Sequence, residues 1–376
     1  MNIPRFLKEQ IINKLEPKKV VVLYGPRQVG KTTLVKEILS ELDSDDWMYV
    51  TGEDRDVATW LGSQSLETLK SNIGNKKLLV IDEAQKIDQI GLSLKLIVDN
   101  IESVKIIATG SSSFDLSNQI GEPLVGRKHQ FVMYPISQLE LEEPVYQAKA
   151  KLSEKIIYGS YPSVLTTNNL NDKKETLKEI VDGYLFKDLL EYDEIKKSQK
   201  IIDILKLIAF QIGKEVSLNE IGRKVSLDLR TVEKYLDLLE KVFVVKRVYG
   251  FSRNLRKEIT KNSRFYFLDN GIRNAIINNY NPIDQRDDIG QLWENYLMSE
   301  RIKYNEYTNN LVNIYFWRTH DQKEIDLVEE KDGKLFGYEF KWGNKKVKVP
   351  TDWVKNYPNS SFEVINQENY LRFIAK

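Results

Sequence analysis

The sequence contains no cysteine and only two histidines, and these absences exclude several kinds of site. Without cysteine there can be no disulfides and no thiolate metal sites. The two histidines, His129 and His320, are far apart in the sequence, which argues against a histidine-rich zinc centre. Any bound metal should therefore have oxygen ligands, and Mg²⁺ is the simplest choice.

Long apolar runs are also absent. The first ten residues are amphipathic but lack the apolar core of a signal peptide, and no run approaches the length of a transmembrane helix. The sequence therefore predicts a soluble, cytoplasmic protein without a membrane partner.

The chain has no excess of charge of one sign, with 56 Lys and Arg against 55 Asp and Glu. A nucleic-acid surface would therefore require local segregation of basic residues. At 376 residues the chain should divide into two or three domains, each long enough to bury its own core. Its oligomeric state is left open, with a homo-oligomer as one possibility.

The most informative stretch is a glycine loop between the apolar run 20–24 and the helical pattern 34–39. The loop residues are Gly25, Pro26, Arg27, Gln28, Val29, Gly30, Lys31, Thr32 and Thr33. Its two glycines allow backbone N–H groups to curve around phosphate oxygens at a helix N-terminus, whose dipole favours anions. Lys31 would reach the β and γ phosphates of ATP, and Thr32 would place its hydroxyl on Mg²⁺. The alternative is a glycine turn with a stray lysine.

A second apolar run ends in two carboxylates, Asp82 and Glu83. Asp82, at the end of a buried parallel strand, can hold a water on Mg²⁺, and Glu83 can polarise the attacking water as a general base. This pair favours hydrolysis over simple binding. The alternative is a strand that merely ends in acids at the surface.

Polar residues follow the next strand as well. A strand predicted at 104–109 opens into residues 110–113, where Ser111 or Thr109 could contact the γ-phosphate or the attacking water; ordinary turn chemistry is the alternative. Farther along, Arg127 precedes a strand predicted at 130–134. It could neutralise transition-state charge or be a solvated surface arginine.

Alternating strands and helices predict an α/β domain with a mostly parallel sheet over residues 1–150. The segments GPRQVGKTT, LLVIDEAQ, IIATGSSS and LVGR, in that order, resemble the prokaryotic AAA-type P-loop ATPases that carry a C-terminal domain of unknown function. The resemblance implies that Lys31, Thr32, Asp82 and Glu83 form a site for ATP and Mg²⁺. It does not identify a substrate.

The middle part, residues 151–285, is predicted to be a helical linker followed by a winged helix-turn-helix. Residues 159–162 resemble the Gly-x-Tyr-Pro stretch that follows the ATPase core in the same family. A capping box begins a helix at Ser217, a second helix begins near Asp228, and the β-rich run 242–248 follows. This is the element order of a winged helix.

Basic residues gather where the wing would lie. Residues 246–264 contain seven cations and one acid, Glu258, for a local net charge of +6. The cations are Lys246, Arg247, Arg253, Arg256, Lys257, Lys261 and Arg264. Such a segment could neutralise phosphates, so DNA is a predicted partner. The alternatives are a protein-contact module and an ordinary solvated loop.

The last part, residues 286–376, combines a helix at 291–300 with a hairpin whose turn contains Asp332 and Gly333. Period-two alternation places Glu339 and Lys341 on one face, and Asp326 on the paired strand could join them.

With the helix residue Glu294, this set resembles the PD-(D/E)xK nucleases and implies a restriction-endonuclease-like α/β domain. The resemblance assigns Asp326 and Glu339 to Mg²⁺, Lys341 to catalysis and Glu294 to an auxiliary role, although Ile325 stands where the family usually has proline. The predicted function is ATP hydrolysis coupled to DNA binding and cleavage. The alternative is an ATP-gated regulatory or scaffold switch that binds DNA or a protein without cutting.

Overall fold

The computed structural model describes residues 3–111, 123–185, 198–252, 263–319, 321–344 and 347–375. The chain divides into two compact units. The N-terminal unit contains Pro4–Tyr134 and Lys241–Phe243, and the C-terminal unit contains Pro135–Glu240 and Val244–Lys376. This division has no boundary at residue 150 or 285.

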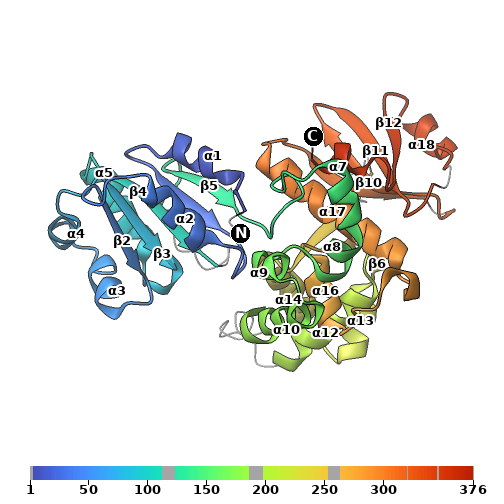
Figure 1. The fold of residues 1–376 in the computed structure, drawn as a ribbon, viewed down its shortest axis with the longest axis horizontal. Helices are drawn as coiled ribbons and strands as arrows, with labels where there is room; N and C mark the ends of the chain where they lie inside the picture. Colours follow the sequence, from blue (N-terminus) through green and yellow to red (C-terminus); the bar gives the residue numbers. More distant parts are fainter. Residues whose placement is uncertain are drawn as a thin grey trace. The chain divides into compact units, whose positions relative to one another are not determined.

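The N-terminal unit is built on a five-stranded parallel sheet with strand order β2-β3-β4-β1-β5 (Figure 1). The strands are β1 (Val20–Tyr24), β2 (Trp47–Thr51), β3 (Leu78–Asp82), β4 (Lys105–Gly110) and β5 (Lys128–Val132). Every residue of β1 and β3 is buried, as expected for apolar runs in a parallel sheet covered on both faces. The predicted α/β fold of this part is confirmed.

Helices precede and connect these strands. They are α1 (Leu7–Lys14), α2 (Lys31–Ser40), α3 (Arg55–Leu61), α4 (Leu66–Ile73), the 3₁₀ helix η1 (Ala84–Lys86) and α5 (Ile90–Asn100). Local sequence explains two of the starts, because Asp54 accepts hydrogen bonds from the first backbone N–H groups of α3 and Ser65 does the same for α4.

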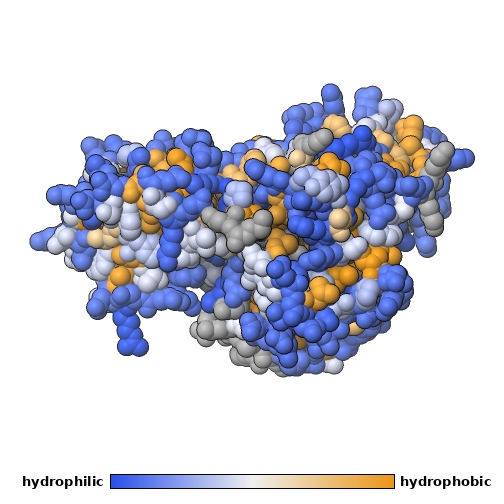
Figure 2. Space-filling view, viewed as in Figure 1, coloured by the Kyte–Doolittle hydropathy of each residue, from blue (hydrophilic) through white to orange (hydrophobic). Residues whose placement is uncertain are grey.

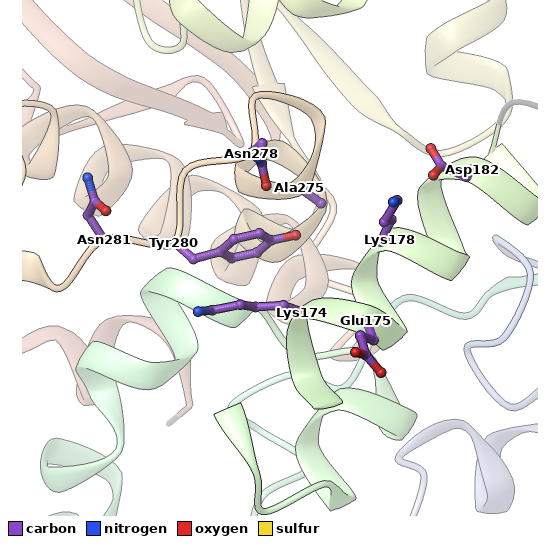
Figure 3. A pocket seen from close by; sticks show the side chains of 8 residues that line it. All are labelled: Lys174, Glu175, Lys178, Asp182, Ala275, Asn278, Tyr280 and Asn281. Atoms are coloured by element: carbon purple, nitrogen blue, oxygen red, sulfur yellow. The ribbon is translucent and has the colours of Figure 1, made fainter. Parts of the chain in front are cut away.

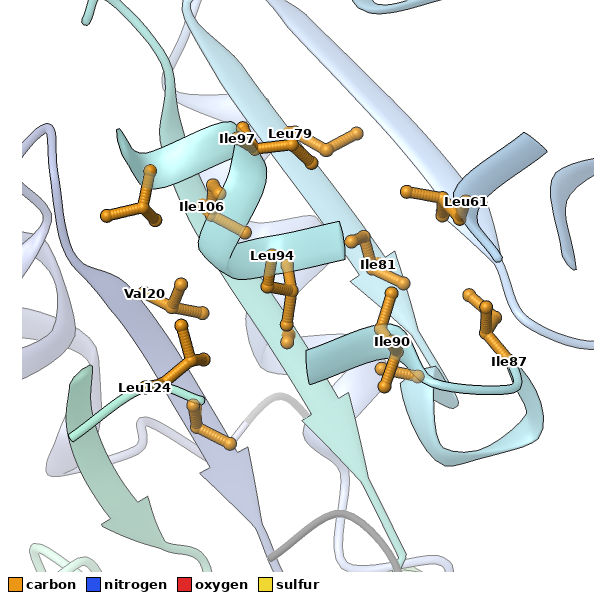
Figure 4. Close-up of a cluster of buried hydrophobic side chains, with 14 of the residues drawn as sticks. Val20, Leu61, Leu79, Ile81, Ile87, Ile90, Leu94, Ile97, Ile106 and Leu124 are labelled. Carbon is orange, nitrogen blue, oxygen red and sulfur yellow. The ribbon is translucent and has the colours of Figure 1, made fainter. Parts of the chain in front are cut away.

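The core of this unit lies between α5 and the sheet (Figure 4). Ile90, Leu94 and Ile97 recur on one face of α5 and pack with Val20 of β1 and Ile106 of β4, and all five side chains are inaccessible to solvent. Burying one such side chain stabilises the fold by about 1.5–3 kcal/mol. This packing fixes the ends of β1, β3 and β4, from which the predicted nucleotide residues project.

The C-terminal unit begins with a helical segment. It contains α7 (Val145–Ala150), α8 (Leu152–Tyr158), α9 (Pro162–Thr166), α10 (Leu170–Glu179) and a π-helical continuation, η2 (Ile180–Leu185). The predicted Gly-x-Tyr-Pro stretch lies between α8 and α9. Gly159 is required there, since its φ is +73° and a Cβ would lie 2.0 Å from the Asp269 carboxylate.

Helices and short strands follow in the order α12 (Ser198–Phe210), β6 (Glu215–Val216), α13 (Leu218–Val225), α14 (Leu229–Lys241), β7 (Val245–Gly250) and β8 (Ser263–Phe267). The helix starts match the predicted caps, because Ser217 accepts a hydrogen bond from Glu220 N and Asp228 accepts one from Thr231 N. β8 pairs with both β6 and β7.

The remaining elements are α16 (Asn270–Ile276), η3 (Ile283–Gln285), α17 (Ile289–Tyr307), β9 (Asn313–Arg318), β10 (Glu324–Lys331), β11 (Lys334–Phe340), α18 (Thr351–Asn356), β12 (Ser361–Ile365) and α19 (Tyr370–Ile374). The predicted hairpin joins β10 and β11 through Asp332 and Gly333, both with positive φ. A single sheet runs β12-β11-β10-β9-β7-β8-β6, because β7 pairs in parallel with β9. Residues on both sides of position 285 therefore share one sheet.

Apolar side chains gather mainly inside the units, and the visible face is mostly hydrophilic with smaller separate apolar areas (Figure 2). Within the described ranges, no helix combines the length and the apolar character needed to cross a lipid bilayer.

Candidate functional site

The glycine loop follows the carboxyl end of β1 and opens helix α2. Gly25 has φ +148°, and a Cβ at this position would lie 2.1 Å from the carbonyl oxygen of Met133. Gly30, the residue before α2, has φ +98°. Larger residues would strain both positions, so the two glycines set the loop's path around the helix N-terminus.

Lys31 is buried at the first position of α2. Its ammonium group donates hydrogen bonds to the carbonyl oxygens of Gly25 at 2.6 Å and Pro26 at 3.0 Å. The loop backbone thus holds the cation beside the N–H groups at the start of α2, where an anion would be favoured. Of the other predicted loop residues, Val29 is buried, Arg27 is half-buried, and Gln28 and Thr33 are exposed.

Asp82, at the carboxyl end of β3, receives three hydroxyl groups. Its Oδ2 accepts hydrogen bonds from Thr32 at 2.8 Å and Tyr49 at 2.6 Å, and its Oδ1 accepts one from Thr109. Burial, followed by the hydrogen bond to Asp82, raises the pKa of Tyr49, so the phenol keeps its proton and donates. The structure therefore joins the end of the loop to the strand-end acid, and Thr109 orients that acid.

Glu83 has a left-handed backbone with φ +51°, and its N–H donates to the Thr109 hydroxyl at 3.2 Å. Its carboxylate accepts a hydrogen bond of 2.5 Å from the Gln85 amide. The same amide nitrogen donates to the Ser111 hydroxyl at 3.0 Å. The Gln85 amide thus links Ser111 to Glu83 at this edge of the sheet.

Sequence reasoning missed three residues of this site: Arg5, Tyr49 and Gln85. Gln85 follows the two carboxylates within the motif LLVIDEAQ, which was the available signal. Arg5 is buried and donates to the carbonyl oxygens of Val29 at 2.8 Å and Tyr134 at 2.7 Å, so it ties the glycine loop to the segment after β5. No spacing rule connects an N-terminal arginine to the loop.

Arg127 lies at the end of the sheet opposite the glycine loop. Its carbonyl oxygen accepts a hydrogen bond of 2.8 Å from Val20 N, at the amino end of β1, whereas the glycine loop follows the carboxyl end. Its exposed side chain forms an ion pair with Asp99 at 2.7 Å. Of the two predicted roles of Arg127, this position and ion pair favour a surface arginine over a contact with the nucleotide of its own chain.

In the C-terminal unit, α17, β10 and β11 contribute buried carboxylates. Lys341 Nζ lies 2.6 Å from Glu339 Oε1, so these two side chains point together as predicted. Asp326 Oδ2 accepts a hydrogen bond of 2.8 Å from Phe340 N, and Glu294 accepts one of 2.6 Å from the Tyr266 hydroxyl. Among the described residues, Glu339 Oε2 is buried without a hydrogen-bond partner.

The expectation that Arg264 is a DNA-contacting cation is corrected, because it is buried in this carboxylate cluster. Its side chain is 3% exposed, and its guanidinium lies 2.7 Å from Glu324, 3.4 Å from Glu294 and 3.7 Å from Asp326. It also stacks over the Phe316 ring at 4.6 Å. The sequence analysis counted Arg264 among the cations of residues 246–264, because nothing in the sequence around it indicates that its side chain is buried.

Burial and mutual repulsion shift the acids of the cluster. Burial, and then the charge of Asp326, raises the pKa of Glu294 to about 8 and the pKa of Glu339 to about 7. Burial likewise raises the pKa of Asp326. In the described part of the chain, no three His, Cys, Asp or Glu side chains are grouped so that they could hold a metal ion.

The rest of the predicted basic segment is only partly described, because Arg253, Arg256, Lys257 and Lys261 lie outside the described residues. Lys246 forms an ion pair with Glu240 at 2.6 Å. Arg247 donates to the Ser263 hydroxyl and lies 3.6 Å from Glu233 on α14. The described cations of this segment, Lys246, Arg247 and Arg264, are thus matched by acids.

A cavity of about 500 Å³ also opens in the C-terminal unit (Figure 3). Lys174, Lys178 and Asp182 line one side, at spacings of four along α10 and η2, and Tyr280 lies opposite. Burial, and then Tyr158, raises the pKa of Tyr280 to about 12. The sequence did not predict this cavity, because its walls come from separate parts of the chain.

Three parts of the chain match known domain families. Residues 17–142 match an AAA domain family, residues 149–282 match a domain of unknown function (DUF8612), and residues 289–367 match another (DUF4143). The first match contains the glycine loop, Asp82 and Glu83. This part of the N-terminal unit is therefore similar to AAA domains.

The relatives are uncharacterised proteins. One from Methanocaldococcus jannaschii is 26% identical over 287 residues, which cover 70% of this chain and 64% of that protein, so the chain spans less than two thirds of it. One from Mycobacterium tuberculosis is 26% identical over 325 residues, covering 86% and 70%. One from Haemophilus influenzae is 24% identical over 352 residues, covering 87% and 83%.

Two solved structures have weaker likeness. AMPPCP-bound DnaA from Aquifex aeolicus has a TM-score of 0.29 and 18% identity, covering 62% of this chain and 85% of that one. The Pif1 helicase from Candida albicans has a TM-score of 0.27 and 14% identity, covering 48% of each chain. At such low TM-scores, neither carries a functional argument.

Proposed function

We propose that this protein binds ATP with Mg²⁺ and hydrolyses it. The hydrogen bond of 2.8 Å between Thr32 and Asp82 carries this proposal, because it joins the P-loop to the acid at the end of β3. Both side chains offer the hard oxygen atoms that Mg²⁺ prefers, so the residues fit the ion. Mg²⁺, when bound, would neutralise charge on the β and γ phosphates.

Lys31 and Glu83 have separate roles in this proposal. The ammonium of Lys31 would exchange its two carbonyl partners for phosphate oxygens, which bind it more strongly because they are charged. Glu83 would take a proton from the attacking water, and its link to Ser111 through Gln85 would keep the carboxylate at the strand edge. ATP turnover, measured with and without single-stranded, duplex and branched DNA, tests both the activity and its coupling to DNA.

We also propose that the C-terminal unit contacts DNA through a winged helix-turn-helix. The order α12, β6, α13, α14, β7, β8 supports this, as does the antiparallel pairing of β8 with β6 and β7. Because acids match the described cations, the proposed phosphate contacts are assigned to residues 253–262.

Replacing Arg253, Arg256 and Lys257 together with alanine should weaken DNA binding and its salt dependence. If each residue touches a phosphate, the slope of log affinity against log salt should shrink by about three units. Fluorescence anisotropy with duplex DNA over a salt series measures this slope. A matched control removes three exposed lysines of the N-terminal unit, Lys14, Lys70 and Lys95. Equal slopes in wild type and a folded triple variant would remove the proposal.

A second candidate function is Mg²⁺-dependent DNA cleavage in the C-terminal unit. It is favoured by Lys341, which contacts Glu339 at 2.6 Å, and by the buried second oxygen of Glu339. The proposal assigns Asp326 and Glu339 to the metal, Lys341 to catalysis and Glu294 to support. Its rival is an ATP-gated switch that binds a partner and cuts nothing.

Asp326→Ala or Lys341→Ala should abolish DNA cleavage and leave ATP turnover intact, because the two sites belong to different units. Linear, circular and branched DNA are incubated with the purified protein in Mg²⁺ or Mn²⁺, with and without ATP. Lys334→Ala, an exposed lysine on the same hairpin, is the matched control. Absence of cutting on every substrate, or cutting that survives both substitutions, would favour the switch.

A further inference from the structure

A metal ion at Asp326 and Glu339 would meet side chains that already have partners. Asp326 Oδ2 accepts a hydrogen bond from Phe340 N, and Glu339 Oε1 accepts one from Lys341. Asp326 Oδ1 faces the guanidinium of Arg264 at 3.7 Å. Glu339 Oε2 has no hydrogen-bond partner among the described residues, and each hydrogen-bonded carboxylate oxygen keeps a second lone pair, so the cation beside Asp326 is the main obstacle to a metal ion.

Arg264 has the properties of a permanent internal cation. A guanidinium does not lose its proton in a protein, so its burial requires acidic partners. Glu324 and Glu294 provide them at 2.7 Å and 3.4 Å, and Phe316 covers the guanidinium plane at 4.6 Å. The backbone of Arg264 is held in the sheet as well, because β8 pairs with β6 and Arg264 lies opposite Glu215.

We infer that Arg264 is the resident cation of the carboxylate cluster and weakens the binding of a divalent metal ion to Asp326 and Glu339 while β8 keeps its place. This inference rests on the proposed nuclease site and deepens it by naming the residue that controls which cation the site takes. The physical reason is repulsion: a divalent ion on Asp326 would lie close to a buried guanidinium in surroundings that screen charge poorly.

Arg264 and the carboxylates that it contacts come from different segments of the chain. The match to the C-terminal family begins at residue 289, whereas Arg264 lies within the preceding match, residues 149–282. The carboxylates and their cation thus come from two different family segments that share one sheet. Any change that withdraws β8 would expose the carboxylates to metal ions, so metal binding depends on a strand outside the nuclease-like segment.

Mn²⁺ binding by the whole 376-residue chain, measured by calorimetry without nucleotide, tests the inference. The variants are wild type, Arg264→Gln and Arg264→Lys, each with and without Asp326→Asn. Arg264→Gln should gain a Mn²⁺ site that Asp326→Asn removes and that binds about tenfold or more tightly than any such site in wild type, because one unit of positive charge is gone. Arg264→Lys keeps the charge and should behave as wild type.

Arg264→Met provides a second route if Arg264→Gln does not fold. The methionine side chain can keep the apolar contact with Phe316 but carries no charge, so it should give the same gain in Mn²⁺ affinity. Circular dichroism melting establishes which variants are folded. The inference is overturned if wild type binds Mn²⁺ through Asp326 as tightly as Arg264→Gln, or if the folded variants gain no Asp326-dependent site.

Failure of the inference and failure of the nuclease proposal give different results. If only the inference is wrong, wild type binds Mn²⁺ through Asp326 as tightly as Arg264→Gln does and cuts DNA in its presence. If only the nuclease proposal is wrong, Arg264→Gln gains the metal site but cuts no DNA substrate.

Discussion

A Glu83→Gln variant should bind ATP normally and hydrolyse it about a hundredfold more slowly or worse, because general-base catalysis by a positioned carboxylate contributes roughly 10²–10⁴-fold. The amide keeps the size of the carboxylate and can still hydrogen-bond to Gln85, but it cannot accept a proton from water. Single-turnover hydrolysis and fluorescent-nucleotide binding, measured on the same preparation, separate the two effects.

Glu67→Gln is the matched control, since Glu67 is an exposed glutamate at the start of α4 in the same unit. It should leave both ATP affinity and hydrolysis unchanged. If Glu83→Gln turns over ATP at the wild-type rate, Glu83 is not the base and another group must activate the water. Equal losses of binding and turnover would instead mean that Glu83 shapes the nucleotide pocket.

Lys31→Ala should lose ATP affinity by about a hundredfold, which corresponds to about 3 kcal/mol and is the size expected for hydrogen bonds to charged groups. The ammonium is held beside the start of α2 by the carbonyl oxygens of Gly25 and Pro26, ready to meet a phosphate. Removing it leaves the backbone N–H groups as the remaining anion donors of the loop. Equilibrium binding of ATP and ADP with Mg²⁺ measures the loss.

Lys70→Ala controls for the removal of one lysine from the N-terminal unit, because Lys70 is exposed on α4. A thermal melt of Lys31→Ala is needed as well, since the variant also loses two internal hydrogen bonds of the loop. Unchanged affinity in a folded Lys31→Ala protein would contradict the proposed phosphate contact.

The sequence was sufficient to predict the parts of the site that follow strand ends. Apolar runs 20–24 and 78–81 are short and continuous, as buried parallel strands are, and the residues after them converge at one edge of the sheet. This is why Thr32 and Asp82, fifty positions apart, could be expected to meet. The same rule places Arg127 away from the nucleotide of its own chain, because a residue before a parallel strand lies at the opposite end of the sheet.

The sequence could not predict which charged residues are buried. The sequences around Arg5 and Arg264 do not distinguish them from surface arginines. Their burial depends on carbonyl and carboxylate partners that are distant in the sequence. The hairpin was predictable because Asp332 and Gly333 are local turn signals. The parallel pairing of β7 with β9 was not, because nothing in the sequence of either strand indicates its partner. Long-range pairing of this kind is decided by tertiary packing.

The pairing of β7 with β9 bears on how the two regions of unknown function could be inherited. A fragment beginning at residue 289 would lack β7 and leave one side of β9 with unpaired backbone groups, a template for aggregation. The same fragment would lack Arg264 and leave Glu294 and Asp326 without their buried cation. Recombination between residues 282 and 289 should therefore yield insoluble products, so the two regions should pass between genomes as one piece.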